Sequence, residues 1–421
     1  MTKKSLVAIA KNVDIQAAIT ETFDLLGGVS KLIKPNTTVV LKPNAGHLAK
    51  AETSVCTNPE VVRAVIKEVK KVNPKRIIVA EAAAIGCDTE KCFELSGIAQ
   101  VCRDENVECI DIKRDKDLLN IPVRGAKSNI THVKLPRFLV EAEHIINLPI
   151  YKTHASMVFT GALKNIKGTV QDKVHMDMHQ DNLAMAMMDV WYAVRPDLNI
   201  MDMIRPAGGY GPHTTVPMDM GCIVGSTDPV AADLVACHMV GLDPAICDYF
   251  EAAEEAGLGT CQMDDIEVVG KTIDEVYKKM WLPYMEGLDG WPEYRILHEH
   301  ACSSCQALLA INMEKLKAVG EYDKHTDMVI VAGKKDSLPT DVPKDKLILH
   351  GNCLRKWKDQ GIFIEGCPPG EINLYMTVMD GRNPGPDDAE TIIRPRMASD
   401  EPVWSNYVAK KAKEFSKSES K

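Results

Sequence analysis

A chain of 421 residues is too long for one compact core, so its length predicts two or three domains. The hydrophobic content of 45% and the charged content of 26% are ordinary for a globular protein in water. The net charge of −9, with basic residues spread along the chain, excludes a general nucleic-acid binder.

The N-terminal segment, Met1–Ala10, has two lysines and a short apolar run that leads directly into charged residues. This pattern favours neither a signal peptide nor a membrane span, so we expect a cytoplasmic protein without a membrane partner. In that reducing compartment, the thirteen cysteines are expected to be buried apolar side chains and metal ligands rather than disulfides. Twenty methionines against 5% aromatic residues favour an anaerobic setting.

Apolar runs typical of buried strands alternate with helix signals in the first two-thirds of the chain. Strands are expected at residues 38–42, 76–80, 107–112, 144–148, 198–204, 222–226 and 264–270, with helices starting near Pro59, near 89, near 180 and at Asp228. This rhythm predicts an α/β fold with a mainly parallel sheet. Ligands of such sheets bind beyond the carboxyl ends of the strands, so the loops after Leu41, Ala80 and Leu148 are the expected site. No glycine-rich nucleotide-binding pattern follows these strands, so nucleotide binding is not supported.

Basic and amide side chains gather at these expected strand ends. If the chain stays extended after residue 149, Lys152 and His154 point the same way. Lys164 and Lys167 share a face if their segment is helical. Such a group can bind a carboxylate or phosphate and move a proton, although a solvated basic helix end is an equally weighted alternative. The candidate catalytic residues are Lys152, His154 and Lys164, and the candidate substrate-binding residues are Lys42, Asn44 and Asn165.

Three further patterns lie between the basic residues and residue 233. His175 and His179 have the spacing of a helical metal site, but without a clear third ligand we expect them to be unliganded. The glycine-rich run Arg205–His213 is expected to be flexible, either a simple turn or a segment that closes over a ligand. Asp228 is expected to cap the helix that Pro229 opens.

The last third of the chain carries its own strands, expected at 327–332 and 346–350, so it is also predicted to be α/β. The predicted domains are an α/β core at 1–285, a smaller cysteine-bearing domain at 286–398 and a charged flexible tail at 399–421.

Four cysteines of the smaller domain suggest one metal centre: Cys302, Cys305, Cys353 and Cys367. Four thiolates suit both a [4Fe-4S] cluster and a structural Zn²⁺ ion, and we favour the cluster. The closely spaced first pair is a weak signal alone, but Cys353 and Cys367 each lie in a turn beside a predicted strand. The two prolines after Cys367 are expected to open a helix over 371–379, which would place this thiol at the positive helix N-terminus.

Five stretches follow one another in a distinctive order over roughly residues 35–245: Val40–Asn44, Thr57–Val62, Ile146–Pro149 with Lys152–His154, Thr160–Gly168 and Ser226–Asp233. In this order they resemble the domain of unknown function 362 family. The resemblance implies an α/β core and, for many members, association with iron–sulfur clusters, but no reaction. A common member pattern has closely spaced cysteines in a tandem ferredoxin module, whereas those here are spread from 302 to 367, which fits a single cluster.

The leading functional hypothesis is an iron–sulfur oxidoreductase of anaerobic metabolism. One [4Fe-4S] cluster would exchange an electron with a small anionic substrate while His154 or Lys164 moves the proton, and an electron-transfer protein would be the partner. The alternative is a non-catalytic protein, either an iron–sulfur electron carrier or a zinc-stapled scaffold. A hydrolase using His154 is a weaker hypothesis because no Ser or Cys nucleophile elbow is present.

Overall fold

The structure of the protein is a computed structural model that describes residues 4–154, 157–179, 182–283, 290–370 and 372–419. The chain forms two compact units, one made of Met1–Thr153 and Phe159–Met280 and the other of His154–Val158 and Trp281–Lys421. The domain boundary expected at 285/286 lies outside the described residues, and the units divide between Met280 and Trp281.

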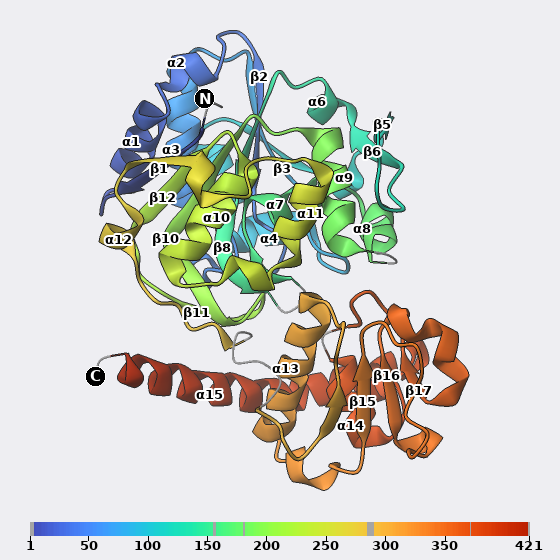
Figure 1. Ribbon diagram of the computed structural model, residues 1–421. Coiled ribbons are helices and arrows are strands. Elements are labelled where there is room, and N and C mark those ends of the chain that lie inside the picture. Colours follow the sequence, from blue (N-terminus) through green and yellow to red (C-terminus); the bar gives the residue numbers. More distant parts are fainter. Residues whose placement is uncertain (1–3, 155–156, 180–181, 284–289, 371, 420–421) are drawn as a thin grey trace. The chain divides into compact units, whose positions relative to one another are not determined.

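The first unit is built on a large mixed sheet (Figure 1). Its strands are β1 (Ser5–Lys11), β2 (Thr38–Pro43), β3 (Arg76–Glu81), β4 (Glu108–Asp111), β7 (His144–Leu148), β8 (Ile150–His154), β9 (Val158–Thr160), β10 (Leu198–Tyr210), β11 (Thr214–Pro217), β12 (Cys222–Ser226) and β13 (Ile266–Gly270). The main path runs β13-β1-β12-β10-β7-β2-β3-β4, while β8 and β11 pair with β10 and β9 pairs with β8. Along that path only β12 runs antiparallel to its neighbours. The α/β fold with a mainly parallel sheet is therefore confirmed.

Helices cover both faces of this sheet. They are α1 (Ile15–Leu25), α2 (Val29–Leu32), α3 (Pro59–Lys70), α4 (Thr89–Ser96), α5 (Ile98–Asp104), α6 (Arg137–Val140), α7 (Ala162–Asn165), α8 (Asp172–Met178), α9 (Leu183–Val194), α10 (Pro229–Val240), α11 (Asp248–Ala256) and α12 (Ile273–Val276). Figure 1 shows α1 and α3 on one face and α10 on the other. Val39 and Leu41 of β2 pack in the same apolar core as Val62 and Val65 of α3, as the alternation of side chains along a strand requires. A separate hairpin joins β5 (Leu118–Pro122) to β6 (His132–Pro136).

The start of α3 brings two loops together. Asn58 is the cap, accepting a hydrogen bond from the Glu60 N–H at 2.9 Å, and a proline occupies the first helical position. Thr57, the other expected cap, instead accepts from the Asn44 N–H at 2.8 Å and donates to the Leu148 carbonyl at 2.7 Å. The hydroxyl of Thr57 therefore joins the loops that follow β2 and β7.

The glycine-rich run after Arg205 is not the loop that its composition predicts. β10 continues through it to Tyr210 and pairs with β11, with Gly208 opposite Val216. A Cβ atom on Gly211 would lie 1.9 Å from the carbonyl oxygen of Thr153. Glycine is needed here because the backbone passes close to another strand, which is a packing requirement rather than a sign of flexibility.

The second unit has a four-stranded, all-parallel sheet in the order β14-β15-β16-β17. Its elements are β14 (Arg295–Leu297), β15 (Val329–Ala332), β16 (Leu347–His350), β17 (Ile362–Ile364), α13 (Ser303–Ala318), α14 (Asn373–Asp380) and α15 (Arg394–Ser418). Ile348 packs with Leu309 and Leu374 of the helices on one face, whereas Leu347 and Leu349 belong to a smaller core on the other. The expected second α/β domain is therefore present.

The frayed tail expected at 399–421 is helical in its described part, because α15 extends from Arg394 to Ser418. Trp404 and Val408 are only 3% and 2% exposed. These two apolar residues, one turn apart, pack the strongly charged helix against its unit, and the Tyr407 hydroxyl adds a hydrogen bond to Glu314 at 2.6 Å. The prediction of a flexible tail rested on the charged composition of the segment and missed these two apolar positions.

Candidate functional site

A row of buried polar residues crosses four neighbouring strands of the first unit. Lys42 of β2 lies opposite Asn147 of β7, Asn147 lies opposite Asn199 of β10, and Asn199 lies opposite Ser226 of β12. Asn147 donates to Asn199 Oδ1 at 2.9 Å, and Asn199 donates to the Ser226 carbonyl at 3.2 Å. All four residues are at most 1% exposed, so their polar groups depend on one another rather than on bulk water.

Asn165 fastens the short helix α7 onto this row. Its Nδ2 donates to the Lys42 carbonyl at 3.0 Å and to Asn147 Oδ1 at 2.8 Å, while its Oδ1 accepts from Asn44 Nδ2 at 3.0 Å. From α10, the buried Asp233 accepts the first two N–H groups of α7 at 2.6 and 2.9 Å. The sheet and α10 together fix the helix that carries Asn165 and Lys164.

Lys42 and Glu81 form a buried ion pair at the ends of β2 and β3. Lys42 Nζ lies 3.0 Å from Glu81 Oε2, and the two side chains are 1% and 2% exposed. Glu81 also accepts the N–H groups of Ala45 and Ala82 at 2.8 and 2.9 Å. Burial lowers the pKa of Lys42 and raises the pKa of Glu81, and in both cases the charge of the partner opposes the shift. The two charges therefore depend on each other.

Three further lysines lie near this pair. Lys152 donates to the Val55 carbonyl and lies 3.4 Å from Asn44 Oδ1, and burial lowers its pKa to about 8. Burial likewise lowers the pKa of Lys167 to about 8. The half-buried Lys164 has neither a hydrogen-bond acceptor nor an ion-pair carboxylate among the described residues. Burial and the repulsion of Lys167, Lys152 and Lys42 lower its pKa well below the ordinary value.

Histidines complete this cationic environment. The rings of His47 and His213 are 4.2 Å apart at 70°. Burial, followed by the charge of Lys152, lowers the pKa of His47 well below its usual value, and its buried Nδ1 has no hydrogen-bond partner in the described part of the chain. Four lysines therefore meet one buried carboxylate, an excess of positive charge that suits a small anion. We call this group of Lys42, Glu81, Lys152, Lys164, Lys167, His47 and His213 the basic site.

His175 and His179 interact with Lys167 in the structure. His175 Nε2 lies 2.6 Å from the Lys167 carbonyl oxygen, and His179 Nε2 lies 2.6 Å from Lys167 Nζ. Each histidine thus uses one ring nitrogen to contact Lys167, so both help to position this lysine.

The four candidate metal ligands of the second unit come from three segments of chain. Cys302 caps α13 and Cys305 lies in its first turn, while Cys353 and Cys367 each follow a strand by three residues. Because all strands of this sheet are parallel, these segments lie at the same sheet edge. The Cys305 thiol is hydrogen-bonded to Cys302, and this bond, burial and the nearby Cys302, Cys367 and Cys353 raise its pKa well above the usual value. Cys353 and Cys367, distant in sequence, thus lie near enough to Cys305 to affect its pKa.

The helix expected over 371–379 is present as α14, Asn373–Asp380. Cys367 lies six residues before its start, so the expectation that this thiol stands at the helix N-terminus is wrong. The thiol at a helix N-terminus is instead that of Cys302, the residue that precedes the first turn of α13.

Four cysteine thiols are the ligands that a cluster or a zinc ion needs, but in the structure they are not arranged around a common centre. Among the described residues, no three His, Cys, Asp or Glu side chains already form a metal site. Gly351, with a φ of 101°, brings the backbone so close that a Cβ atom would lie 3.7 Å from Cys305 Sγ. His350, at the end of β16, is fully buried, and neither ring nitrogen has a partner within the described ranges. Buried polar groups normally have a hydrogen-bonding or metal partner, and this imidazole has none there.

Replacing His350 with leucine is expected to stabilise the metal-free protein by about 1–2 kcal/mol, because a buried and unsatisfied polar ring is removed. The measurement is urea unfolding of metal-free samples, with the exposed His132 replaced by leucine for comparison. If His350 exists to contact a bound group, the same variant retains less metal. A variant that is less stable without metal would contradict this account.

The comparisons with known proteins concern mainly the first unit. The sequence profile of the family described as Domain of unknown function (DUF362) matches residues 39–238. These residues belong to the DUF362 family. The matched span contains the polar row, Glu81, all four lysines of the basic site and Asp233, but it ends before the four cysteines of the second unit. Membership therefore bears on the basic site and not on the candidate metal centre.

The DUF362 domain also has a named relative. The "thylakoid-associated protein sll1697" of Synechocystis sp. is 29% identical over 253 residues, which cover 58% of this chain and 75% of that protein. Within the described residues, no helix has the length and apolar character needed to cross a bilayer.

Two solved structures show weaker likenesses. The lactate racemase apoprotein from Thermoanaerobacterium thermosaccharolyticum is 12% identical with a TM-score of 0.35, over 56% of each chain. A protein from Thermotoga maritima is 13% identical with a TM-score of 0.33, over 79% of this chain and 89% of its own.

The DUF362 domain brings together five of the six residues predicted for the substrate site: Lys42, Asn44, Lys152, Lys164 and Asn165. His154 ends β8, two residues after Lys152, and falls by its contacts into the second unit. The sequence prediction missed Glu81, His47 and His213. Glu81 directly follows Ala80, at a strand end already expected to line the site, and that position was the available signal.

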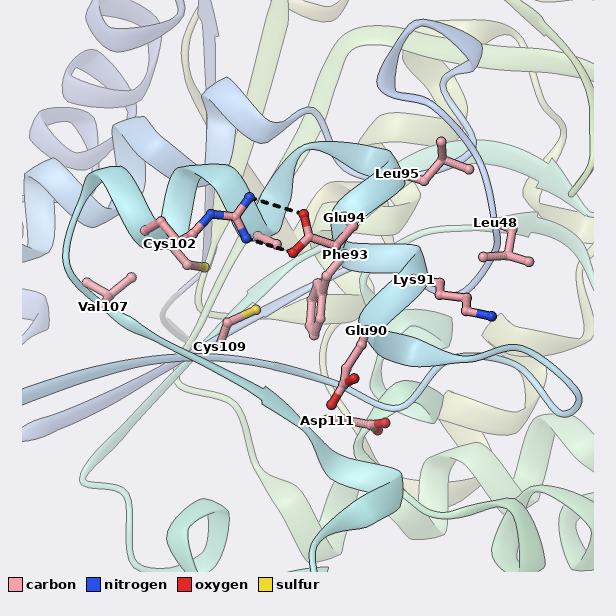
Figure 2. A pocket seen from close by; sticks show the side chains of 12 residues that line it. Leu48, Glu90, Lys91, Phe93, Glu94, Leu95, Cys102, Val107, Cys109 and Asp111 are labelled. Atoms are coloured by element: carbon pink, nitrogen blue, oxygen red, sulfur yellow. Dashed lines mark hydrogen bonds and ion pairs between the residues drawn. The ribbon is translucent and has the colours of Figure 1, made fainter.

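A pocket of about 990 Å³ lies elsewhere on the DUF362 domain, between α4, α5 and the edge strand β4 (Figure 2). Arg103 and Glu94 form a two-pronged ion pair across it, at 2.6 and 3.1 Å. Cys102 of α5 and Cys109 of β4 lie near each other in this pocket, with a hydrogen bond between their side chains (Figure 2). Its walls are otherwise largely apolar, and the lysines of the basic site do not line it.

Proposed function

We propose that this protein is a cytoplasmic iron–sulfur redox enzyme of anaerobic metabolism that acts on a small anionic substrate. Cys302, Cys305, Cys353 and Cys367 would hold one [4Fe-4S] cluster, and an electron-transfer protein would be its partner. The observation that carries the proposal is the approach of these four thiols at one edge of the parallel sheet. Soft sulfur ligands suit iron. Burial and the neighbouring Cys302 raise the pKa of Cys353, and the charge of Lys334 opposes that shift.

The substrate would bind at the basic site of the DUF362 domain. Among the described residues no carboxylate lies within ion-pair distance of Lys164, so its ammonium would hold the carboxylate or phosphate of the substrate. Lys152 has a pKa of about 8, which lets one group both attract an anion and exchange a proton near neutral pH. When bound, a cluster supplies one-electron transfer, while these side chains bind the substrate and manage its proton.

Metal analysis of anaerobically purified protein tests the centre. The proposal expects about four iron and four sulfide ions per chain, little zinc and visible absorption from the cluster. Cys353→Ser is expected to lose most of the iron, whereas Cys261→Ser, at a half-buried cysteine of the other unit, should retain it. Stoichiometric zinc without sulfide would replace the redox proposal by the zinc-stapled scaffold.

Anion binding tests the basic site and separates an enzyme from a simple electron carrier. Calorimetry with inorganic phosphate and with acetate is expected to show binding that Lys164→Met weakens by at least about tenfold, as expected when a charged hydrogen bond to a bound anion is lost. Lys34→Met, at an exposed lysine, is the matched control. Unchanged affinity in Lys164→Met would remove the basis for a substrate site here.

The affinity for the same anions is also expected to fall as the pH rises. The pKa of about 8 at Lys152 means that its ammonium is mostly protonated at pH 7 and mostly neutral at pH 9. If one such lysine must be protonated for binding, the anion affinity is expected to fall about tenfold between pH 7 and pH 9. Lys167, whose pKa is also about 8, adds to this decrease. Titration of anion binding at pH 7, 8 and 9 measures this slope, and equal affinity throughout would exclude these lysines as the binding cations.

A further inference from the structure

A second group of thiols lies at the start of α4 in the first unit. Cys87 directly precedes Asp88, the cap of α4, and Cys92 lies in the first turns of this eight-residue helix. Cys92 is fully buried, whereas Cys87 is half-buried and reaches solvent. The two side chains are hydrogen-bonded to each other. One accessible and one buried thiol, in contact at a helix N-terminus, are the parts that thiol–disulfide exchange requires.

The surroundings distinguish the two sulfurs. The Cys92 thiol, the Leu48 N–H and the charge of Lys113 lower the pKa of Cys87 to about 6, against the opposing effect of burial. The hydrogen bond to Cys87 and burial raise the pKa of Cys92. Lys113 is held in place by donating to the carbonyl oxygens of Cys87 and Ala84 at 3.1 and 3.3 Å. At neutral pH the accessible sulfur is therefore the thiolate and the buried sulfur is the thiol.

We infer that Cys87 and Cys92 form a redox-active dithiol that reduces small disulfides. The Cys87 thiolate attacks one sulfur of a disulfide R–S–S–R, so that a Cys87–S–S–R bond forms and RS⁻ leaves. The Cys92 thiol gives its proton to that thiolate and attacks the Cys87 sulfur, which expels the second RS⁻. In forming the Cys87–Cys92 disulfide the protein loses two electrons and one proton, that of Cys92. The substrate is reduced to one RSH and one RS⁻, and the RS⁻ takes its proton from water.

The position of the dithiol favours a disulfide that carries carboxylates. Cys56 interacts electrostatically with both Cys87 and Lys152, and its thiol donates to the His47 carbonyl at 3.5 Å. The dithiol thus lies at the margin of the basic site, whose lysines attract anions. This activity needs no metal, so it stands apart from the proposed cluster.

The other close thiol pair of this unit, Cys102 and Cys109, serves as an internal comparison (Figure 2). There the buried Cys102 has the lowered pKa, while the exposed Cys109 has the raised one. The sulfur that is the better thiolate is therefore the one that a substrate reaches less easily. Two thiols in contact therefore do not by themselves give an accessible thiolate beside a buried thiol, as found at Cys87 and Cys92.

Equilibration of the full chain in glutathione redox buffers, followed by alkylation and peptide mapping, tests the inference. Trypsin cleaves after Lys91, so a Cys87–Cys92 disulfide joins peptides 77–91 and 92–103, whereas a Cys102–Cys109 disulfide joins 92–103 and 104–113. We expect the 77–91/92–103 product to form as the buffer becomes more oxidising and to disappear on reduction. Its absence at every glutathione ratio would overturn the inference.

Two variants and a pH profile assign the separate functions of the thiols. Cys92→Ala should leave glutathione attached to Cys87, because the mixed disulfide can no longer be resolved, and Cys261→Ser should behave as the unaltered protein. Alkylation of Cys87 by iodoacetamide should level off above about pH 6, whereas alkylation of Cys261, whose pKa burial raises to about 11, should still be rising at pH 9. Failure to trap glutathione in Cys92→Ala would contradict the resolving function. Metal content and phosphate binding would be unaffected by that failure.

Discussion

Glu81→Ala is expected to destabilise the protein by about 3–5 kcal/mol, because it leaves the ammonium of Lys42 buried without its counter-charge. The same change removes the acceptor of two backbone N–H groups, those of Ala45 and Ala82. Each unsatisfied group adds a cost of its own. For a protein stabilised by roughly 5–15 kcal/mol, this is a large fraction of the total. Urea unfolding monitored by circular dichroism measures the loss.

A double-mutant cycle separates the ion pair from the other contacts. Lys42→Met should cost less than Glu81→Ala, since it leaves no backbone N–H unpaired. The double variant should be at least about 2 kcal/mol more stable than the sum of the single effects predicts, because neither charge remains alone. The exposed pair of Arg76 and Glu108, at 2.5 Å, is the control, and Glu108→Ala should cost no more than about 1 kcal/mol. Additive effects in the Lys42–Glu81 cycle would show that the two charges are not coupled.

Gly168→Ala is expected to cost about 3 kcal/mol or more and to abolish anion binding at the basic site. A Cβ atom at this position would lie 1.7 Å from Glu81 Oε1 and 2.7 Å from Lys42 Nζ. Overlap of this size forces the ion pair apart, and small-to-large changes in packed sites typically cost about 1–3 kcal/mol even without such a conflict. Thermal unfolding and phosphate calorimetry on the same sample measure both effects.

Gly46→Ala supplies the matched control in the loop after β2. No atom lies within 4 Å of a Cβ added there, so stability and phosphate affinity should change little. A Gly168→Ala variant that behaved like Gly46→Ala would mean that the buried pair can move aside at low cost. In that case, the basic site would not depend on the absence of a side chain at Gly168.

The sequence by itself determined the elements of the DUF362 domain and much of its site. Apolar runs ending at Leu41, Ala80 and Leu148 predict parallel strands, and parallel strands place their carboxyl ends at one edge. That rule was sufficient to bring Lys42 and Asn165 together, although they are 123 residues apart, and they do meet in the structure. Local signals also located the caps of α3 and α10, because a cap depends only on residues within one turn.

Only the tertiary structure decided which side chains are partners. In the sequence, Glu81 is only the polar residue that ends an apolar strand. Its pairing with Lys42, which is 39 residues away, depends on how the two strands align in the sheet. The run from Arg205 to His213 was predicted to be a flexible loop, because neither the pairing of β10 with β11 nor the Thr153 carbonyl that requires Gly211 can be seen in the local sequence. The same limit applies to His154, whose contacts belong to the other unit, and to Cys87 and Cys92, whose unequal burial no local pattern reveals. Strand and helix signals are local, whereas burial, charge pairing and pKa depend on contacts that form only when the whole chain is folded.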